Sequence, residues 1–145
     1  MNLADQIKET YSDNFVAYYR AHSCHLNIVG TNFYEYHKLL QKVYEDAQEN
    51  IDTIGEIIRT LDELAPETLG EILSLASLGD DTTSDTGAPG LLELVLDSQE
   101  HMIGSYRALY EAAEDADECD ISNFSQDRIR VHKKFVWMLK SSLES

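Results

Sequence analysis

The chain has 145 residues, 43% of them hydrophobic, which is enough for one domain with a buried core and too few for two. Its 27 acidic and 11 basic residues give a formal net charge of −16, so the surface lacks the basic groups with which proteins displace counterions from nucleic-acid phosphates. We therefore expect a single domain over residues 1–145 that repels DNA and anionic membranes and attracts cations.

The N-terminus and the cysteines indicate a cytoplasmic location. The opening sequence MNLADQIKET lacks the basic start and the apolar centre of a signal peptide. The sequence contains no run of about eighteen apolar residues, so we expect no membrane-spanning helix. Cys24 and Cys119 stand at unpatterned positions, so we expect two reduced thiols and no thiolate metal site.

Regular spacing predicts two long helices in the first part of the chain. Residues three and four apart share one face from the start of the chain onward: Leu3, Ile7, Tyr11, Phe15, Tyr18 and His22. Gly30 is expected to stop this helix, and Asn32 with Glu35 three positions later forms a capping pattern that starts the next. The second helix is expected to run to about Leu64. Its apolar stripe is Leu40, Val43, Ala47, Ile51, Ile54, Ile58 and Leu61.

The rest of the chain predicts one short helix and two long ones. Pro66 is expected to open the short helix. Residues 79–90, GDDTTSDTGAPG, are all loop formers. A fourth helix is expected from about Leu91 to Asp115, and the last from near Ser122. We therefore expect an all-α fold, a four-helix bundle with a short extra helix in the crossover between the second and third long helices.

Two pairs of polar residues on the first two helices have the chemistry of a metal site. The histidine pair, His25 and His37, flanks the predicted turn, so the two side chains should face each other. The carboxylate pair, Asp52 and Glu56, is spaced by four residues and therefore shares one helix face. Neutral imidazole with carboxylate suits a divalent first-row metal such as iron, and the absence of thiolate argues against a structural zinc site.

The two pairs cannot meet within one chain. His37 and Asp52 are fifteen residues apart on one helix, which corresponds to roughly 22 Å, whereas a metal bond is about 2 Å long. The site closes only if two copies of the second helix pack antiparallel about a two-fold axis near residue 45 or 46, which would give two identical sites per dimer. The alternative is that the histidines are satisfied within the bundle and the carboxylates form a solvated face, and residue types alone favour that alternative.

Several stretches resemble the Dps family, the DNA-protection-during-starvation proteins or miniferritins. They are HLNIVGTNFYEYH at residues 25–37, the fifteen-residue step to Asp52, DTIGE at residues 52–56 and HKKFVWML at residues 132–139. The resemblance implies a ferritin-like four-helix bundle, assembled as a hollow dodecamer with ferroxidase sites at two-fold interfaces. It also implies the iron ligands His25, His37, Asp52 and Glu56. The Glu-x-x-His signature of ordinary ferritins is absent, since no Glu stands three before any His.

The function implied by this resemblance is that of a cytoplasmic iron-storage protein. It would oxidise Fe²⁺ with hydrogen peroxide or O₂ at sites for two irons, store the ferric mineral and protect against oxidative damage. Zinc is a possible substitute metal. The alternative is a catalytically weak cage that sequesters metal or acts as a scaffold, with little or no DNA binding.

The sequence departs from the family pattern at three places. Gln41, a neutral and weaker ligand, stands where many members have an aspartate four residues after the second histidine. Leu26 replaces the tryptophan that commonly follows the first histidine. The lysine-rich tail that some members use to bind DNA is missing, in line with the acidic composition.

A few further residues have side chains that could belong to a site. His22, three before His25, could touch the metal, although the family pattern does not select it. His101 and His132 have no companion carboxylate at ligand spacing. Trp137 is expected in the core or at an interface. Three acidic residues near the start of the last helix correspond either to a pore that attracts Fe²⁺ or to a solvated helix start: Glu118, Asp120 and Asp127.

Overall fold

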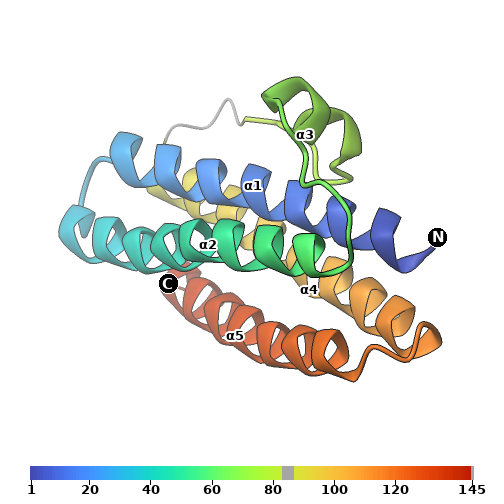
Figure 1. Ribbon diagram of the computed structural model, residues 1–145. Helices are drawn as coiled ribbons and strands as arrows, with labels where there is room; N and C mark the ends of the chain where they lie inside the picture. Colours follow the sequence, from blue (N-terminus) through green and yellow to red (C-terminus); the bar gives the residue numbers. More distant parts are fainter. Residues whose placement is uncertain (83–86, 145) are drawn as a thin grey trace.

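The computed structural model describes residues 1–82 and 87–144 and forms a bundle of four long helices with one short helix (Figure 1). The helices are α1 (Leu3–Asn27), α2 (Phe33–Thr60), α3 (Leu69–Leu75), α4 (Ala88–Asp115) and α5 (Cys119–Leu143). Helix α1 packs against α2 and α4, α4 packs against α5, and α3 lies on α1. The expected all-α bundle with a short helix in the crossover is thus confirmed.

The turn between α1 and α2 forms as expected, but Asn32 does not cap α2 in the expected way. Gly30 has φ of 107°, which a residue with a side chain rarely adopts. Asn32 precedes α2 with φ of 67°, in the left-handed region, and its side chain makes no capping hydrogen bond. A capping box needs an extended N-cap residue, so the backbone of this tight turn prevents one.

The end of α2 and the start of α3 also differ from the sequence-based expectations. Helix α2 ends at Thr60 rather than near Leu64, because the chain enters the left-handed region at Asp62, with φ of 61°. The short helix does not open at Pro66. It begins after Thr68, whose hydroxyl accepts a hydrogen bond from the Glu71 backbone N–H at 3.1 Å.

The last two helices each begin about a turn earlier than predicted. Helix α4 begins at Ala88 instead of Leu91, with a proline in its first turn, where a missing N–H costs nothing. Helix α5 begins at Cys119 instead of Ser122. Of the predicted loop over residues 79–90, residues 83–86 lie outside the described part of the chain. None of the described helices combines the length and the apolar character that crossing a membrane requires.

A buried aspartate attaches the crossover to the bundle. Asp13 on α1 is 0% exposed and accepts hydrogen bonds from the backbone N–H groups of Ser77 and Leu78, at 2.7 and 2.9 Å. The hydroxyls of Ser77 and Ser105 also donate to it, each at 2.9 Å. A buried carboxylate with four donors is well satisfied, so the segment after α3 is held on α1 and α4.

A second polar network crosses the bundle between α2, α4 and α5. Arg128 on α5 forms an ion pair with Asp46 on α2 and donates a hydrogen bond to Nε2 of His132 at 2.8 Å. His132 Nδ1 donates to the side-chain oxygen of Gln99 at 2.6 Å. The imidazole is therefore neutral. Burial, and secondarily the positive charge of Arg128, hold the pKa of His132 well below its ordinary value of 6.5.

The neutral state of His132 predicts a pH dependence of stability. Unfolding exposes an imidazole that takes up a proton below about pH 6.5, whereas the folded one stays neutral, so stability falls as pH falls below that value. The contribution of His132 approaches about 1.4 kcal/mol per pH unit. Urea unfolding between pH 6.5 and 5.5 should give a smaller pH slope for His132→Gln than for the native protein. Equal slopes would show that His132 does not titrate on unfolding.

Candidate metal centre

The histidine pair lies where α1 ends and α2 begins. The imidazole rings of His25 and His37 are stacked, with centroids 3.7 Å apart and planes inclined by 17°. Phe33, in the first turn of α2, stacks on the other side of His37 at 4.9 Å. The tight turn at Gly30 brings the two helix ends together, so the expectation that the histidines face each other is confirmed.

Hydrogen bonds fix the tautomer of both histidines. Nδ1 of His25 lies 2.7 Å from the backbone carbonyl oxygen of His37, and Nδ1 of His37 lies 2.9 Å from the carbonyl oxygen of His25. A carbonyl oxygen only accepts, so each Nδ1 carries the hydrogen and each Nε2 keeps its lone pair. Imidazoles that ligate metals are commonly held in this way by a bond from the other ring nitrogen. The pair therefore offers two oriented nitrogen donors.

The carboxylate pair lies far along the same helix. Asp52 and Glu56 are exposed on α2 and line a shallow hollow with Tyr11 and Arg59. Burial and, less strongly, the charge of Asp52 raise the pKa of Tyr11, which places this carboxylate close to the phenol. Within the described residues neither carboxylate accepts a hydrogen bond or forms an ion pair. Their oxygen atoms are thus available to a ligand from outside the chain.

One chain does not bring the two pairs together. Helix α2 is unbroken from Phe33 to Thr60, so the rise of about 1.5 Å per residue separates His37 from Asp52 by roughly 22 Å. In keeping with this, no group of three or more His, Cys, Asp or Glu side chains within residues 1–82 and 87–144 is placed to hold a metal ion. The histidines, one on α1 and one on α2, and the carboxylates, both on α2, therefore form two separate pairs.

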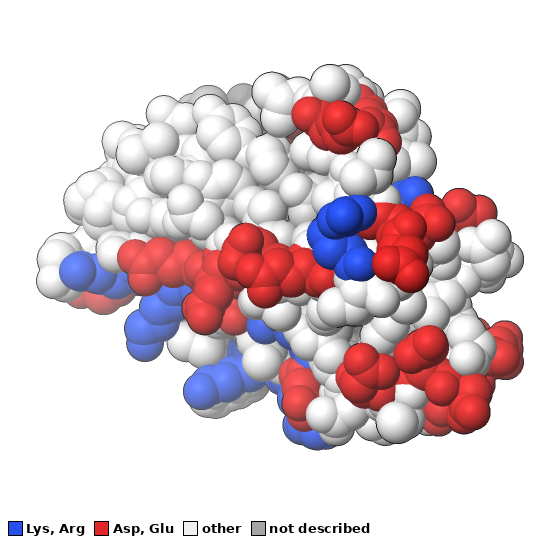
Figure 2. Space-filling model, in the orientation of Figure 1, with Lys and Arg blue, Asp and Glu red and all other residues white. Residues whose placement is uncertain are grey.

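The helix face between the two pairs is polar and mostly acidic. Acidic side chains form a band along α2, below the uncharged surface of α1 (Figure 2). Within this face Gln41 donates a hydrogen bond to the carboxylate of Glu45 at 2.6 Å. Gln41 occupies the position where the family pattern has an aspartate. Its amide nitrogen is hydrogen-bonded to Glu45, one turn further along the same helix.

Sequence reasoning gave too little weight to three aromatic residues beside the histidine pair. His22 stacks on Tyr44 with centroids 4.0 Å apart and planes inclined by 1°, and Tyr44 meets His25 edge-on at 5.0 Å. The hydroxyl of Tyr18 lies 2.8 Å from His22 Nδ1. Helical spacing could have indicated this cluster, because Tyr44 follows His37 by seven residues and Tyr18 precedes His22 by four.

Other predicted residues lie elsewhere. Trp137 is 64% exposed, so its assignment to the core of the chain was wrong, and its place at an interface stays a prediction. His101 does have a carboxylate neighbour, because its Nε2 lies 3.4 Å from Asp13. Near the start of α5, Asp127 is paired with Arg130 at 2.7 Å.

Glu118, Asp120 and the two cysteines belong to no group of metal ligands among the residues that the structure describes. Glu118 and Asp120 lie at the N-terminal end of α5, where acidic side chains favour the helix dipole. Cys24 is buried and Cys119 is exposed, and both are free thiols, as expected. Burial raises the pKa of Cys24 to about 11, so this thiol stays protonated.

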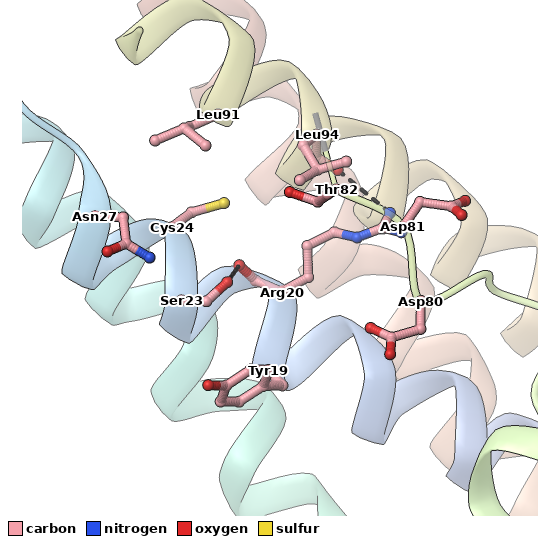
Figure 3. A pocket seen from close by; sticks show the side chains of 10 residues that line it. All are labelled: Tyr19, Arg20, Ser23, Cys24, Asn27, Asp80, Asp81, Thr82, Leu91 and Leu94. Atoms are coloured by element: carbon pink, nitrogen blue, oxygen red, sulfur yellow. Dashed lines mark hydrogen bonds between the residues drawn. The ribbon is translucent and has the colours of Figure 1, made fainter. Parts of the chain in front are cut away.

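A second hollow, between α1, residues 80–82 and α4, does not suit a metal ion (Figure 3). Arg20 extends into it from α1 and is only 8% exposed. Its guanidinium donates to the backbone carbonyl oxygens of Gly79, at 2.6 Å, and Leu94, at 3.5 Å. Asp80 and Asp81 also line this hollow, but no group of metal ligands forms there among the described residues. Arg20 serves to attach the crossover to α4.

Comparison with known proteins matches this chain to the family described as "Ferritin-like domain" over residues 4–145. The "DNA protection during starvation protein" of Helicobacter pylori strain J99 is 24% identical over 143 residues, which cover 99% of each chain. The protein of the same name from Brevibacillus brevis is 27% identical over 129 residues, 89% of this chain and 86% of that one.

Solved structures agree with these sequence matches. A Dps protein from Vibrio cholerae O1, described as a member of a broad superfamily of ferritin-like diiron-carboxylate proteins, superposes with a TM-score of 0.90 at 27% identity. The superposition covers 98% of this chain and 89% of that one. A Dps protein from Bacillus brevis gives a TM-score of 0.91 at 25% identity, covering 98% and 95%.

Proposed function

This chain belongs to the ferritin-like family and, within it, to the Dps proteins, and from that premise we propose that it binds iron, oxidises Fe²⁺ and stores the ferric product in a cage built from copies of itself. The observation that carries the proposal is the pair of stacked imidazoles whose Nε2 atoms are both left as lone-pair donors. Two such nitrogens beside carboxylates suit Fe²⁺.

The site is completed by a second copy of the chain. Two α2 helices packed antiparallel about a two-fold axis near residue 45 or 46 place the histidine pair of one copy opposite the carboxylate pair of the other. Each such dimer then contains two identical sites, because an isologous contact makes every interaction twice. The exposure of Asp52 and Glu56, and their lack of partners among the described residues, support this arrangement.

The chemistry at this site is the one-electron oxidation of Fe²⁺, with hydrogen peroxide as the proposed oxidant. The negative carboxylates offset the cation charge and favour Fe³⁺ over Fe²⁺, and the histidines hold the geometry. Removing Fe²⁺ and peroxide together prevents them from forming hydroxyl radicals in the cytoplasm. The net charge of −16 draws Fe²⁺ to the protein and keeps DNA away, so the protection is chemical.

The proposal extends to a dodecamer whose inner wall carries acidic residues that start mineral growth. Glu118 and Asp120 are proposed to line a pore that admits Fe²⁺, and both are near the acidic start of α5. Asp127 contributes less charge to such a pore, because Arg130 already neutralises it.

The activity is tested by following ferric absorbance after Fe²⁺ is added without oxygen, with and without peroxide. We expect Fe³⁺ to form faster with the protein and peroxide than in buffer with peroxide, and the acceleration to be smaller in a separate sample that is given air instead of peroxide. Iron binding without any acceleration over buffer would instead identify a cage that only sequesters metal. A protein that neither binds iron nor accelerates its oxidation would contradict both functions.

A further inference from the structure

The exposed face of α2 carries charges of opposite sign on its two halves. Between His37 and the end of the carboxylate pair, two exposed basic side chains come first and exposed acidic side chains follow: Lys38 and Lys42, then Glu45, Glu49, Asp52 and Glu56. Figure 2 shows basic atoms at the α1–α2 end of the acidic band. When a second α2 packs antiparallel to the first, such a separation of charge places the basic half of each helix beside the acidic half of the other.

We propose that this face of α2 binds the same face of a second copy, and that Lys42 of each chain forms an ion pair with Glu49 of the other. The two ion pairs select the antiparallel register of the dimer. This inference rests on the proposed function, because it takes the antiparallel arrangement of α2 from there. It goes further by assigning a contact between the two iron sites, at residues that bind no iron.

Two separate features of α2 indicate the same two-fold axis. The proposed iron ligands require an axis near residue 45 or 46. Lys42 and Glu49 stand equally far from the midpoint between these two residues, so the same axis brings each of them opposite the other. The two positions are seven residues apart, about two helical turns, so both side chains lie on one side of the helix.

The two side chains have no partner within their own chain. Lys42 and Glu49 are exposed, and within residues 1–82 and 87–144 neither side chain forms an ion pair or a hydrogen bond. Glu45, which lies nearest to its own copy across the axis, differs from them because it accepts the hydrogen bond from Gln41 at 2.6 Å. Lys42 also precedes Glu45 by three residues on the same helix face, which offsets the negative charge beside the axis.

The effect of these ion pairs is expected in the choice of partner. Exposed ion pairs add little to stability, because water screens them and ordering the side chains costs entropy. Like charges placed opposite each other across an interface are strongly unfavourable, so charge patterns exclude wrong pairings. A test of Lys42 and Glu49 therefore has to measure which chains pair, and not only how tightly they pair.

The test exchanges charges between two kinds of chain and is carried out without iron. One chain carries Lys42→Glu and the other carries Glu49→Lys. Either chain paired with itself has two contacts between like charges, whereas a mixed dimer has two contacts between opposite charges. At low salt we expect about nine tenths of the dimers from co-expressed chains to be mixed, against one half for random pairing. Native mass spectrometry counts the dimers, after surface collision releases them from any larger assembly.

The matched control makes the same changes of charge away from this face. Lys133→Glu on α5 and Glu93→Lys on α4 alter exposed residues and change the net charge of each chain by the same amount. This second pair of chains should combine at random, which separates a local contact from the general attraction between more and less acidic chains. In about 1 M salt the Debye length falls to about 3 Å, so the preference of the α2 variants for mixed dimers should become small.

The outcomes separate this inference from the proposed function. Random pairing of the α2 variants, an absence of mixed dimers, or an equal preference in the control pair would overturn the contact between Lys42 and Glu49. None of these results would affect the ferroxidase function. Selective pairing would support the contact even if the native protein failed to accelerate Fe²⁺ oxidation, because no iron is present. A native protein that forms no dimer would overturn both the shared iron site and this contact.

Discussion

Glu56→Gln is expected to slow the oxidation of Fe²⁺ at least about tenfold, the lower end of the effect seen when even the outer partners of a metal site are removed. Glutamine has nearly the same shape as glutamate, so the change removes a charged oxygen ligand without leaving a gap in the surface. Asp52→Asn should act in the same direction. Initial rates of Fe³⁺ absorbance after anaerobic addition of Fe²⁺ and peroxide measure both.

The control for this experiment is Glu93→Gln, which removes one negative charge from an exposed position on α4. If the acidic surface merely concentrates Fe²⁺, the control and Glu56→Gln should lose activity equally. If Glu56 is a ligand, the control stays near the native rate. Equal rates for all three proteins would remove the carboxylate pair from the mechanism.

The fold could be predicted from the sequence because its determinants are local. Residues at steps of three and four defined the first two long helices, and the turn between them required positive φ at Gly30 and Asn32. The predicted positions of the helix ends were less accurate, because several local sequence preferences compete at a helix end. Asn32 and Glu35 have the spacing of a capping box, but the tight turn places Asn32 in the left-handed region. Its side chain therefore makes no capping hydrogen bond.

The separation of the two pairs of candidate ligands was also predictable. The rise of a helix is fixed, so fifteen residues between His37 and Asp52 imply a distance that no side chain can span. The continuous α2 helix retains that separation. This length alone implies that a second chain is needed to bring the two pairs together.

The orientation of the histidines could not be predicted in the same way. Each Nδ1 donates to the backbone carbonyl of the other histidine. Every residue has a backbone carbonyl, so the sequence does not show which one accepts such a bond. The rotation of α1 against α2 decides whether such bonds form. The same rotation brings Tyr44 into contact with both His22 and His25, so this cluster of rings depends on how the two helices pack.

The site that we propose would make assembly a condition for activity. A chain on its own holds nitrogen donors at one end of α2 and oxygen donors at the other, so neither end provides a full set of ligands. Fe²⁺ would therefore be oxidised only after copies of the chain have met. This arrangement also predicts that two different inactive chains can restore each other.

Complementation between two inactive variants tests this central claim most directly. One variant carries His25→Ala with His37→Ala, and the other carries Asp52→Asn with Glu56→Gln. In a mixed dimer one site contains both the substituted histidines and the substituted carboxylates. The other site contains the native histidines of one variant and the native carboxylates of the other variant. If equal amounts assemble at random, half of the dimers are mixed and about one quarter of all sites are intact.

The measurement is the initial rate of Fe³⁺ formation in proteins assembled separately and together. We expect each variant alone to be inactive and the co-assembled protein to recover about one quarter of the native rate, in proportion to its intact sites. Mixing the variants after separate assembly should restore nothing. A co-assembled protein as inactive as its parents, with mixed dimers shown to be present by mass spectrometry, would contradict a site shared between two chains.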